Sequence, residues 1–257
     1  MGILNVTPDS FYSGSRVSET DGVLRRAEKM LEDGATFLDV GGMSSRPGAE
    51  LVTEEEELKR VLPAIEAIHS RFPEALISID TVWASVARKA VEAGACMVND
   101  ISAGRLDPKL YETVADLQVP YVLMHMQGTP RDMQRDPQYE NVVEEVMDFL
   151  TMELGKLREL GVHDVILDPG FGFGKTVAHN YTLLRELSGL QILEAPLLVG
   201  ISRKSMITRV LEVSPEEALN GTTALHMVAL QEGARILRVH DVKEASEVIR
   251  IFSQLGT

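Results

Sequence analysis

Polar or charged side chains stand where nearly every short apolar run of this chain ends. A turn former or helix cap explains any one of them, and for Asp9, Thr81 and Asp100 that interpretation is sufficient. Their recurrence at nearly every run instead predicts a shared polar pocket. The side chains in question, in chain order, are Asn5, Asp39, Asp80, Asn99, His125, Asp168, Ser202, Arg203, Lys204, Arg238 and His240.

The cations of this set gather after the last two apolar runs, and the loop after the second run adds Arg46. Gly200 to Lys204 follows the seventh run, where barrels of alternating strands and helices often bind phosphate at a helix N-terminus. Arg238 and His240 point to one side of an extended strand, so the pair could hold one anion. An ion pair of this segment with Asp241 is the alternative.

Other motifs indicate less. The stretch Asp168 to Thr176 resembles a phosphate-binding loop, but Pro169 stands where that motif needs glycine, so we expect a flexible loop that brings Phe173 to the pocket. Met124-His125-Met126 is interpreted as core packing or loop contacts rather than a soft-metal site, because alternate strand residues face opposite ways. Cys96 is expected to be a buried structural thiol. The remaining histidines are predicted to lie on the surface: His69, His163, His179 and His226.

The elements that must position these residues alternate between strand and helix. Eight β-rich runs are predicted as strands at residues 3–7, 36–40, 76–80, 96–99, 121–124, 165–168, 197–199 and 235–239. Helical periodicity lies between them, and Thr53-Glu56 and Ser214-Glu217 have the form of capping boxes. The acidic run Glu54 to Glu57 is interpreted as helix N-terminal charge rather than a metal site. We therefore predict an α/β fold, a (β/α)8 TIM barrel.

Composition narrows the class of protein. A chain of 257 residues that is 44% hydrophobic suits one domain over residues 1–257. The net charge of -14 disfavours nucleic acid and anionic membrane surfaces as partners. One cysteine, no signal peptide and no long apolar run favour a cytoplasmic location.

In sequence order, the motifs resemble those of the dihydropteroate synthases, which are pterin-binding enzymes. They are Met1-Gly-Ile-Leu-Asn5-Val-Thr-Pro-Asp-Ser-Phe11, Asp39-Val-Gly-Gly-Met-Ser-Ser45-Arg46-Pro47-Gly48, Ile79-Asp80-Thr81, Asn99-Asp100-Ile101, Met124-His-Met-Gln-Gly128, Asp168-Pro-Gly-Phe-Gly-Phe-Gly-Lys175, Ser202-Arg-Lys204 and Arg238-Val-His240-Asp241. The resemblance implies that 6-hydroxymethyl-7,8-dihydropterin pyrophosphate and 4-aminobenzoate give 7,8-dihydropteroate and pyrophosphate. It also implies Mg2+ as cofactor and a homodimer.

The resemblance also implies a role for each matching residue. The pterin site would consist of Asp80, Asn99, Asp168 and Lys204. Pyrophosphate would bind to Asn5, Arg46, Arg238 and His240, with Asn5 also on the metal. Ser45, Ile101, Met124 and Gly200 would also bind substrate. The aminobenzoate site would consist of Phe11, Pro47, Phe173, Ser202 and Lys204. Of these, Arg46, Lys204, Arg238 and His240 are the predicted catalytic residues, and they would act by positioning and electrostatics.

This chain departs from the family pattern in two loops. Tyr12-Ser13-Gly14 stands where an aspartate is usual, and Met43 and Ser45 stand where glutamate and threonine are usual. Relatives also carry an N-terminal stretch that closes the barrel floor, so we expect residue 1 not to be the natural start. Two alternatives stay open: a noncatalytic pterin-binding paralogue, and a corrinoid-linked methyltetrahydrofolate methyltransferase, which would have no pyrophosphate to hold.

Overall fold

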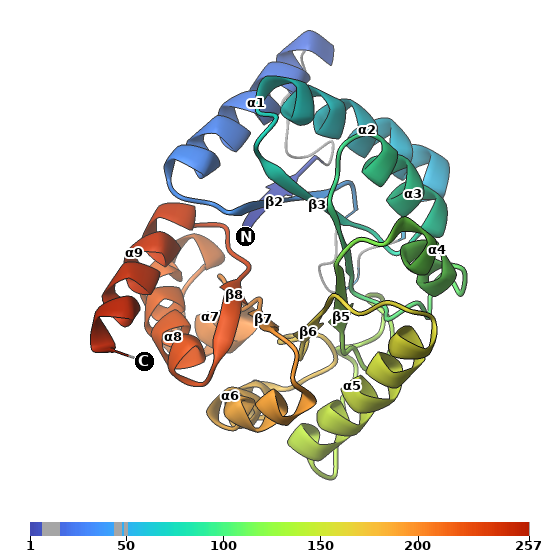
Figure 1. Cartoon of the computed structure of the whole chain (residues 1–257). Coiled ribbons are helices and arrows are strands. Elements are labelled where there is room, and N and C mark those ends of the chain that lie inside the picture. Colours follow the sequence, from blue (N-terminus) through green and yellow to red (C-terminus); the bar gives the residue numbers. More distant parts are fainter. Residues whose placement is uncertain (7–15, 44–47, 49–50, 257) are drawn as a thin grey trace.

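Eight parallel strands form one sheet in the order of the sequence, and the sheet curls into a barrel (Figure 1). The computed structural model describes residues 1–6, 16–43, 48 and 51–256. The strands are β1 (Gly2–Asn5), β2 (Phe37–Gly41), β3 (Leu76–Asp80), β4 (Met97–Asp100), β5 (Tyr121–Met124), β6 (Val165–Asp168), β7 (Leu197–Val199) and β8 (Ala234–Leu237). The predicted (β/α)8 barrel is confirmed, and four predicted strands have the observed bounds.

The first and last strands meet and close the ring. The amide of Ile3 donates to the carbonyl of Val239 at 2.9 Å, and the amide of Val239 donates to the carbonyl of Met1 at 2.9 Å. Closure brings residues from the two ends of the sequence into one wall. A side chain on β8 can therefore contact side chains on β2 and β3.

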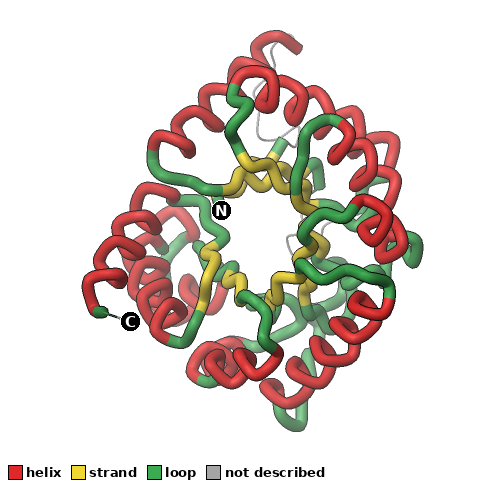
Figure 2. The backbone as a smooth tube through the Cα atoms, in the orientation of Figure 1, coloured by secondary structure: helices red, strands yellow, loops and turns green. Residues whose placement is uncertain are grey.

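Helices surround the sheet, as Figure 2 shows. The α-helices are α1 (Arg16–Glu32), α2 (Glu54–Arg71), α3 (Ala84–Glu92), α4 (Leu110–Leu117), α5 (Val142–Glu159), α6 (Val177–Arg185), α7 (Ser205–Leu211), α8 (Leu219–Gln231) and α9 (Val242–Phe252). Short 3-10 helices are η2 (Leu187–Leu193), η3 (Pro215–Glu217) and η4 (Ser253–Leu255). Each strand thus leads outward to a helix that returns the chain to the start of the next strand.

Local chemistry explains where two of these helices begin. The hydroxyl of Thr53 accepts from the amide of Glu56 at 3.3 Å and caps α2, as the sequence predicts. Ser214 and Glu217 also form the predicted capping box, but it opens the one-turn η3 and not an α-helix. The α-helix of that segment, α8, begins two residues later at Leu219.

Inward-facing residues of the strands divide the barrel interior into an apolar layer and a polar layer. The apolar layer packs Met97, Val122, Ile166 and Leu198 together, with Phe37 and Ile236 against them. Strand side chains alternate, so the residues two places further along point the same way. These are Asp39, Asn99, Met124, Asp168 and Arg238. The polar layer therefore lies at the carboxyl ends of the strands, directly above the packed apolar layer.

Three predictions about single residues change in the structure. His226 is not on the surface: it is 2% exposed, on the face of α8 that packs inward. Cys96 is half-buried rather than fully buried, and desolvation raises the pKa of its thiol, which opposes a nucleophilic role. His179 is partly buried because its side chain completes the cap of α6 with Thr176. His69 and His163 lie on the surface as predicted.

Candidate active site

The carboxyl ends of neighbouring strands place the predicted polar residues in one layer. Asn5 of β1 lies beside Gly41 of β2, Gly41 lies beside Asp80 of β3, and Asp80 lies beside Asn99 of β4. Asp168 ends β6 next to Met124 of β5. Parallel strands with this register bring residues from distant parts of the sequence to one rim of the barrel.

A guanidinium from the last strand bridges two carboxylates in this layer. Arg238 donates from Nε to Asp39 Oδ2 at 2.7 Å and from Nη2 to Asp80 Oδ2 at 2.6 Å. Burial opposes the charged form of Arg238, but the two carboxylates outweigh it and raise its pKa. The sequence marked Asp39 as a strand-end residue without predicting a role, and the structure makes it the anchor of Arg238. Arg238 therefore does not pair with Asp241.

In each of three strand-end side chains, one polar atom has a hydrogen-bond partner within the protein and one oxygen has none among the described residues. Asn99 donates from Nδ2 to Asp39 at 3.0 Å, Asp168 Oδ1 accepts from the amide of Gly170 at 2.7 Å, and Asp80 Oδ2 accepts from Arg238. Among the described residues no hydrogen bond reaches Asn99 Oδ1, Asp80 Oδ1 or Asp168 Oδ2. The protein fixes these side chains and leaves oxygens for a ligand.

Burial also affects the acid–base state of these carboxyls. Asp80 is 8% exposed and Asp168 is 6% exposed. Desolvation raises the pKa of both groups, and nearby cations oppose the shift: Arg238 for Asp80, and Lys204 for Asp168. Raised pKa values of clustered carboxyls in a polar layer are typical of functional sites.

Lys204 lies over the loop that follows β6. Its Nζ donates to the carbonyl of Phe171 at 2.6 Å and lies 4.1 Å from the centre of the Phe173 ring. Burial lowers the pKa of Lys204 to about 8, while the carboxylate of Asp168 opposes the shift. Phe173 thus lies beside Lys204, as the prediction that it reaches the pocket requires. Phe171, Phe173 and Lys175 of this loop are all buried, and the flexibility of the loop stays a prediction.

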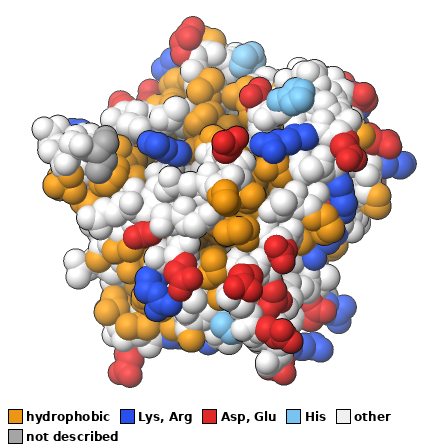
Figure 3. All heavy atoms as spheres, turned by 60° about the horizontal axis from the view of Figure 1, so that its bottom comes forward, with side chains coloured by type: hydrophobic (Ala, Val, Ile, Leu, Met, Phe, Trp, Pro, Cys, Tyr) orange, Lys and Arg blue, Asp and Glu red, His pale blue; other side chains and the backbone are white. Residues whose placement is uncertain are grey.

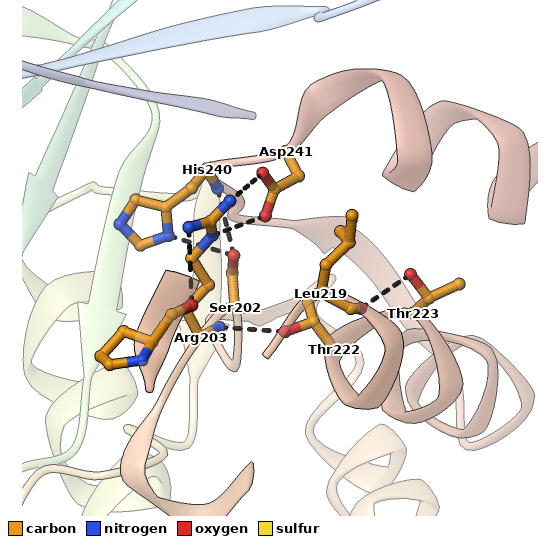
Figure 4. A network of polar contacts seen from close by, with 8 residues as sticks. Ser202, Arg203, Leu219, Thr222, Thr223, His240 and Asp241 are labelled. Atoms are coloured by element: carbon orange, nitrogen blue, oxygen red, sulfur yellow. Dashed lines mark hydrogen bonds and ion pairs between the residues drawn. The ribbon is translucent and has the colours of Figure 1, made fainter. Parts of the chain in front are cut away.

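The last two strand ends form a second polar cluster, shown in Figure 4. Ser202 Oγ lies 3.1 Å from His240 Nδ1 and accepts from the amide of His240 at 3.2 Å. Arg203 makes a two-pronged ion pair with Asp241, at 2.8 Å from Nε and 2.6 Å from Nη2. The prediction that Arg203 contributes an available cation to the pocket is therefore wrong. The ion pair with Asp241, which the sequence left as the alternative for Arg238 and His240, forms with Arg203 instead.

His240 differs from the other members of this cluster because its side chain is exposed. Partial desolvation and the guanidinium groups of Arg238 and Arg203 lower its pKa below the ordinary value, and water attenuates the shift. His240 therefore offers a neutral N–H donor at pH 7. Gly200 lies beside Arg238, and a Cβ added at Gly200 would be 3.9 Å from the Cβ of Arg238.

An apolar cluster lies beside the polar layer at the same end of the barrel. Its members are Met43, Val82, Ile101, Met124, Met126, Met133 and Phe173, all at most 8% exposed. Ile101 and Met124 are predicted site residues, whereas Met126 and Met133 were not predicted. Met43, which replaces the glutamate usual in the family, is 7% exposed, so its burial in this cluster suits an apolar side chain.

Several predicted residues lie outside the described part of the chain: Phe11, Ser13, Ser45, Arg46 and Pro47, together with Asp9. Among the described residues, Thr81 and Asp100 have the structural roles expected of them. Thr81 accepts from the amide of Trp83 at 3.2 Å, and Asp100 accepts from the amides of Ser102 and Gly104 at 2.7 Å each.

Glu57 differs from the other glutamates at the start of α2. It is fully buried, and one carboxylate oxygen accepts from the Thr81 hydroxyl at 2.8 Å. Its other oxygen has no hydrogen-bond partner among the described residues. Desolvation raises the pKa of Glu57 to about 7. Helix N-terminal charge, as predicted, explains Glu54 to Glu56 but not this residue.

Among the residues that the structure describes, no group of three or more His, Cys, Asp or Glu side chains could hold a metal ion. In the same residues, no helix is long and apolar enough to cross a bilayer. A cavity of about 330 Å³ opens at the opposite end of the barrel, lined by Phe37, Met97 and Pro196 among others, and no residue of the polar layer lines it.

Comparison with known proteins decides the family. The model of the pterin binding enzymes matches residues 1–240. The chain belongs to this family. A dihydropteroate synthase of Escherichia coli K12 is 46% identical over 98% of this chain and 89% of its own length. That of Haemophilus influenzae is 45% identical over 98% of this chain and 92% of its own length. The resemblance drawn from the motifs is confirmed.

Solved structures of this family share the fold. A dihydropteroate synthase of Yersinia pestis with a sulfonamide drug complex is 44% identical and superposes with a TM-score of 0.93, over 99% of this chain and 92% of its own. That of Xanthomonas albilineans with 4-aminobenzoic acid is 42% identical with a TM-score of 0.92, over 99% and 91%. The chain is therefore a transferase of the dihydropteroate synthase type.

Proposed function

We propose how individual side chains of this chain act in dihydropteroate synthesis. The assignment rests on the groups that share one rim of the barrel. Oxygens of Asp80, Asn99 and Asp168 are available there to accept hydrogen bonds from a ligand. Arg238 and Lys204 supply positive charge at the same rim. A pterin edge presents paired N–H donors, which a carboxylate accepts side by side. The cations suit the pyrophosphate that leaves.

In this proposal each residue acts through electrostatics and position. Asp168, Asn99 and Asp80 orient the pterin, and Ile101, Met124 and Gly200 line its site. Arg238, His240 and Asn5 hold the pyrophosphate together with Ser45 and Arg46. Phe11, Pro47, Phe173, Ser202 and Lys204 would contact 4-aminobenzoate.

The reaction breaks one bond and forms one bond. The carbon–oxygen bond of the pterin methylene breaks, and its electron pair leaves with the pyrophosphate. The amine nitrogen bonds to the same methylene carbon and then loses a proton. An aromatic amine is neutral at pH 7, so the site needs no strong base. Arg238 and the N–H of His240 stabilise the charge that grows on the leaving group, which suits a dissociative path.

Mg2+ remains a proposal, with Asn5 as its described ligand. The carboxamide of Asn5 lies across Gly41 from Asp80, and a Cβ added at Gly41 would be 3.6 Å from Asn5 Oδ1 and 3.4 Å from Asp80 Oδ2. Oxygen donors suit Mg2+, which usually takes one or two protein ligands besides substrate phosphates and water. Bound there, the ion would neutralise charge on pyrophosphate.

The homodimer and the cytoplasmic location also remain proposals, as does the assignment of residues 1–257 to one domain. Exposed apolar side chains on α7 and α9 support a second copy as partner: Val210, Leu211, Ile249 and Ile251 are 45% to 60% exposed. Sedimentation equilibrium tests the dimer.

Pyrophosphate release with both substrates and Mg2+ tests the function. Turnover that requires both substrates is the expected result. Binding of the pterin pyrophosphate without release would instead indicate a noncatalytic paralogue, and methyl transfer from methyltetrahydrofolate would indicate the methyltransferase. Asp168→Asn should weaken pterin binding in calorimetry, whereas Asp164→Asn, a change at an exposed position before β6, should not.

A further inference from the structure

Lys175 is a buried lysine that the proposed mechanism does not use. It is 2% exposed, and its Nζ lies 2.8 Å from His125 Nδ1, 3.0 Å from the carbonyl of Gly170 and 3.2 Å from the carbonyl of Phe173. These contacts use all three ammonium donors, and none of them is with a carboxylate. An ammonium buried in this way costs stability, and its burial lowers the pKa of Lys175 to about 7. Its placement therefore calls for a reason other than stability.

The segment that Lys175 holds has an unusual backbone. Gly170, Gly172 and Gly174 have φ values of +71°, +80° and +63°, a region that residues with a Cβ rarely adopt. A segment so rich in glycine has little conformational preference of its own. Lys175 fastens it at two carbonyls, those of Gly170 and Phe173.

The same segment carries groups of the active site. The carbonyl of Phe171 accepts from Lys204 Nζ, and the ring of Phe173 lies under that ammonium at 4.1 Å. In the proposed function both Lys204 and Phe173 face 4-aminobenzoate. One contact of Lys175 is therefore with Phe173 itself, and the other is with Gly170, the residue before Phe171.

His125 fixes the other side of the lysine. Its amide donates to the carbonyl of Asp168 at 3.0 Å, and its ring packs edge-on against Phe149 with centroids 5.0 Å apart. Burial, with the nearby charges of Lys175 and Arg105, lowers the pKa of His125 to about 2, so its ring is neutral. A neutral Nδ1 can accept from the lysine ammonium, which orients Lys175 from a rigid strand end.

We propose that Lys175 and His125 are a positioning pair, which holds residues 170–174 so that Phe173 and Lys204 receive the arylamine. The inference rests on the proposed function for the identity of that substrate. Of the proposed pterin contacts, Asp80 and Asn99 lie on strands that the pair does not touch, whereas Asp168 accepts from the amide of Gly170 at one end of the held segment. Loss of the pair should therefore raise the KM for 4-aminobenzoate by a larger factor than it raises the Kd of the pterin substrate.

The experiment compares Lys175→Met, His125→Leu and the double variant with the parent chain. Each single change removes one partner of the Lys175–His125 contact and puts an apolar side chain of similar size in its place. Displacement of the loop should raise the KM for 4-aminobenzoate by about 10-fold or more. The double variant should be no worse than the poorer single variant, because both changes remove the same contact. The Kd of the pterin substrate, measured by calorimetry, should rise by a clearly smaller factor.

Two controls separate positioning from general stability. His125→Asn should keep the KM for 4-aminobenzoate near that of the parent chain, because the amide oxygen of asparagine can accept from Lys175 in place of Nδ1. Lys156→Met, at an exposed lysine paired with Glu153, should change neither constant. An unchanged KM in Lys175→Met would overturn the proposal. So would equal losses in KM and pterin Kd, because they would indicate disordering of the whole site.

The proposal remains testable if the parent chain has no turnover. That result would refute the proposed function alone. Amide hydrogen exchange of residues 170–174 then decides the positioning role. Exchange that is faster in Lys175→Met than in Lys156→Met supports the role, and equal exchange refutes it.

Discussion

The change Asp39→Asn tests whether two carboxylates are needed to hold Arg238. Asp39 is fully buried, and its Oδ2 accepts from Arg238 Nε at 2.7 Å and from Asn99 Nδ2 at 3.0 Å. The other oxygen, Oδ1, has no partner in the described part of the chain. An asparagine whose amide oxygen replaces Oδ2 keeps both hydrogen bonds and the shape. The substitution therefore removes the charge and little else.

The size of the effect follows from the contacts that remain. Separating a buried ion pair costs about 3 to 5 kcal/mol, because one charge is left without a partner. Here Asp80 still holds the guanidinium at 2.6 Å, so the loss should be smaller. Replacing a charge-assisted hydrogen bond by a neutral one accounts for about 1 to 2 kcal/mol. We expect the free energy of unfolding to fall by about 2 kcal/mol, and kcat/KM for pyrophosphate release to fall as Arg238 shifts toward Asp80.

Urea unfolding followed by circular dichroism measures the first quantity, and steady-state kinetics measure the second. Asp33→Asn serves as the control, because Asp33 pairs with the exposed Lys29 at the end of α1. That variant should behave like the parent chain. If Asp39→Asn unfolds at the same urea concentration as the control and keeps its kcat/KM, the second carboxylate beside Arg238 contributes neither to stability nor to catalysis.

Three further predictions concern other parts of the barrel. Burial raises the pKa of Glu57 from 4.5 to about 7, so the folded state holds this proton more tightly than the unfolded chain. The free energy of unfolding should then fall by up to about 3 kcal/mol as the pH rises from about 4.5 to 7. In urea titrations at several pH values, Glu57→Gln should show a weaker pH dependence of this free energy. The same pH dependence in the variant and the parent chain would contradict the prediction. Gly170→Ala should destabilise by several kcal/mol, roughly the cost of strain and overlap combined, because its Cβ would lie 1.8 Å from the His125 carbonyl oxygen. Its control is Gly155→Ala, which has open space around it in α5 and should instead raise Tm. Arg203→Met should leave the KM for the pterin substrate unchanged, because the guanidinium of Arg203 is already paired with Asp241. A higher KM in this variant would show that Arg203 does contact the substrate anion.

The strands could be predicted because buried parallel strands are short, nearly continuous apolar runs. Their order followed from the alternation with helices, and the strand-end residues followed from the shared rim of such a barrel. The partners of the cations could not be predicted in the same way. Arg203 and Arg238 are both strand-end arginines, yet one meets Asp241 close to it in space and the other meets carboxylates on β2 and β3. Only the closure of the barrel decides between them.

Two errors had signals in the sequence. Glu57 shares one helical face with Val61, Ala64 and Ile68, and this spacing of four, seven and eleven residues places it toward the core. Charge alone suggested a solvated position. His226 lies in a stretch of α8 that is apolar on both sides, which favours burial over exposure. Periodicity was the better guide in both cases.

The surface charge pattern is consistent with an anion site inside the barrel rim. The chain carries a net charge of -14, and on the face shown in Figure 3 acidic and basic side chains are interspersed rather than separated. A polyanionic substrate gains little attraction from such a surface at long range. The cations of the rim, Arg238 and Lys204, are instead desolvated, where an ionic contact is stronger than in water.

Asp80 connects the two halves of the proposed reaction. Its Oδ2 holds Arg238 at 2.6 Å, while Oδ1 has no hydrogen bond among the described residues and is available to the pterin. When pyrophosphate draws Arg238 toward itself, Asp80 loses part of its cationic partner and becomes a better acceptor for the pterin N–H. Pterin and pyrophosphate should therefore strengthen each other's binding, by the same factor in both directions. Calorimetric titration of pyrophosphate with and without a pterin measures that factor. In Asp80→Asn the factor should approach one, and an undiminished coupling in that variant would exclude Asp80 as the link.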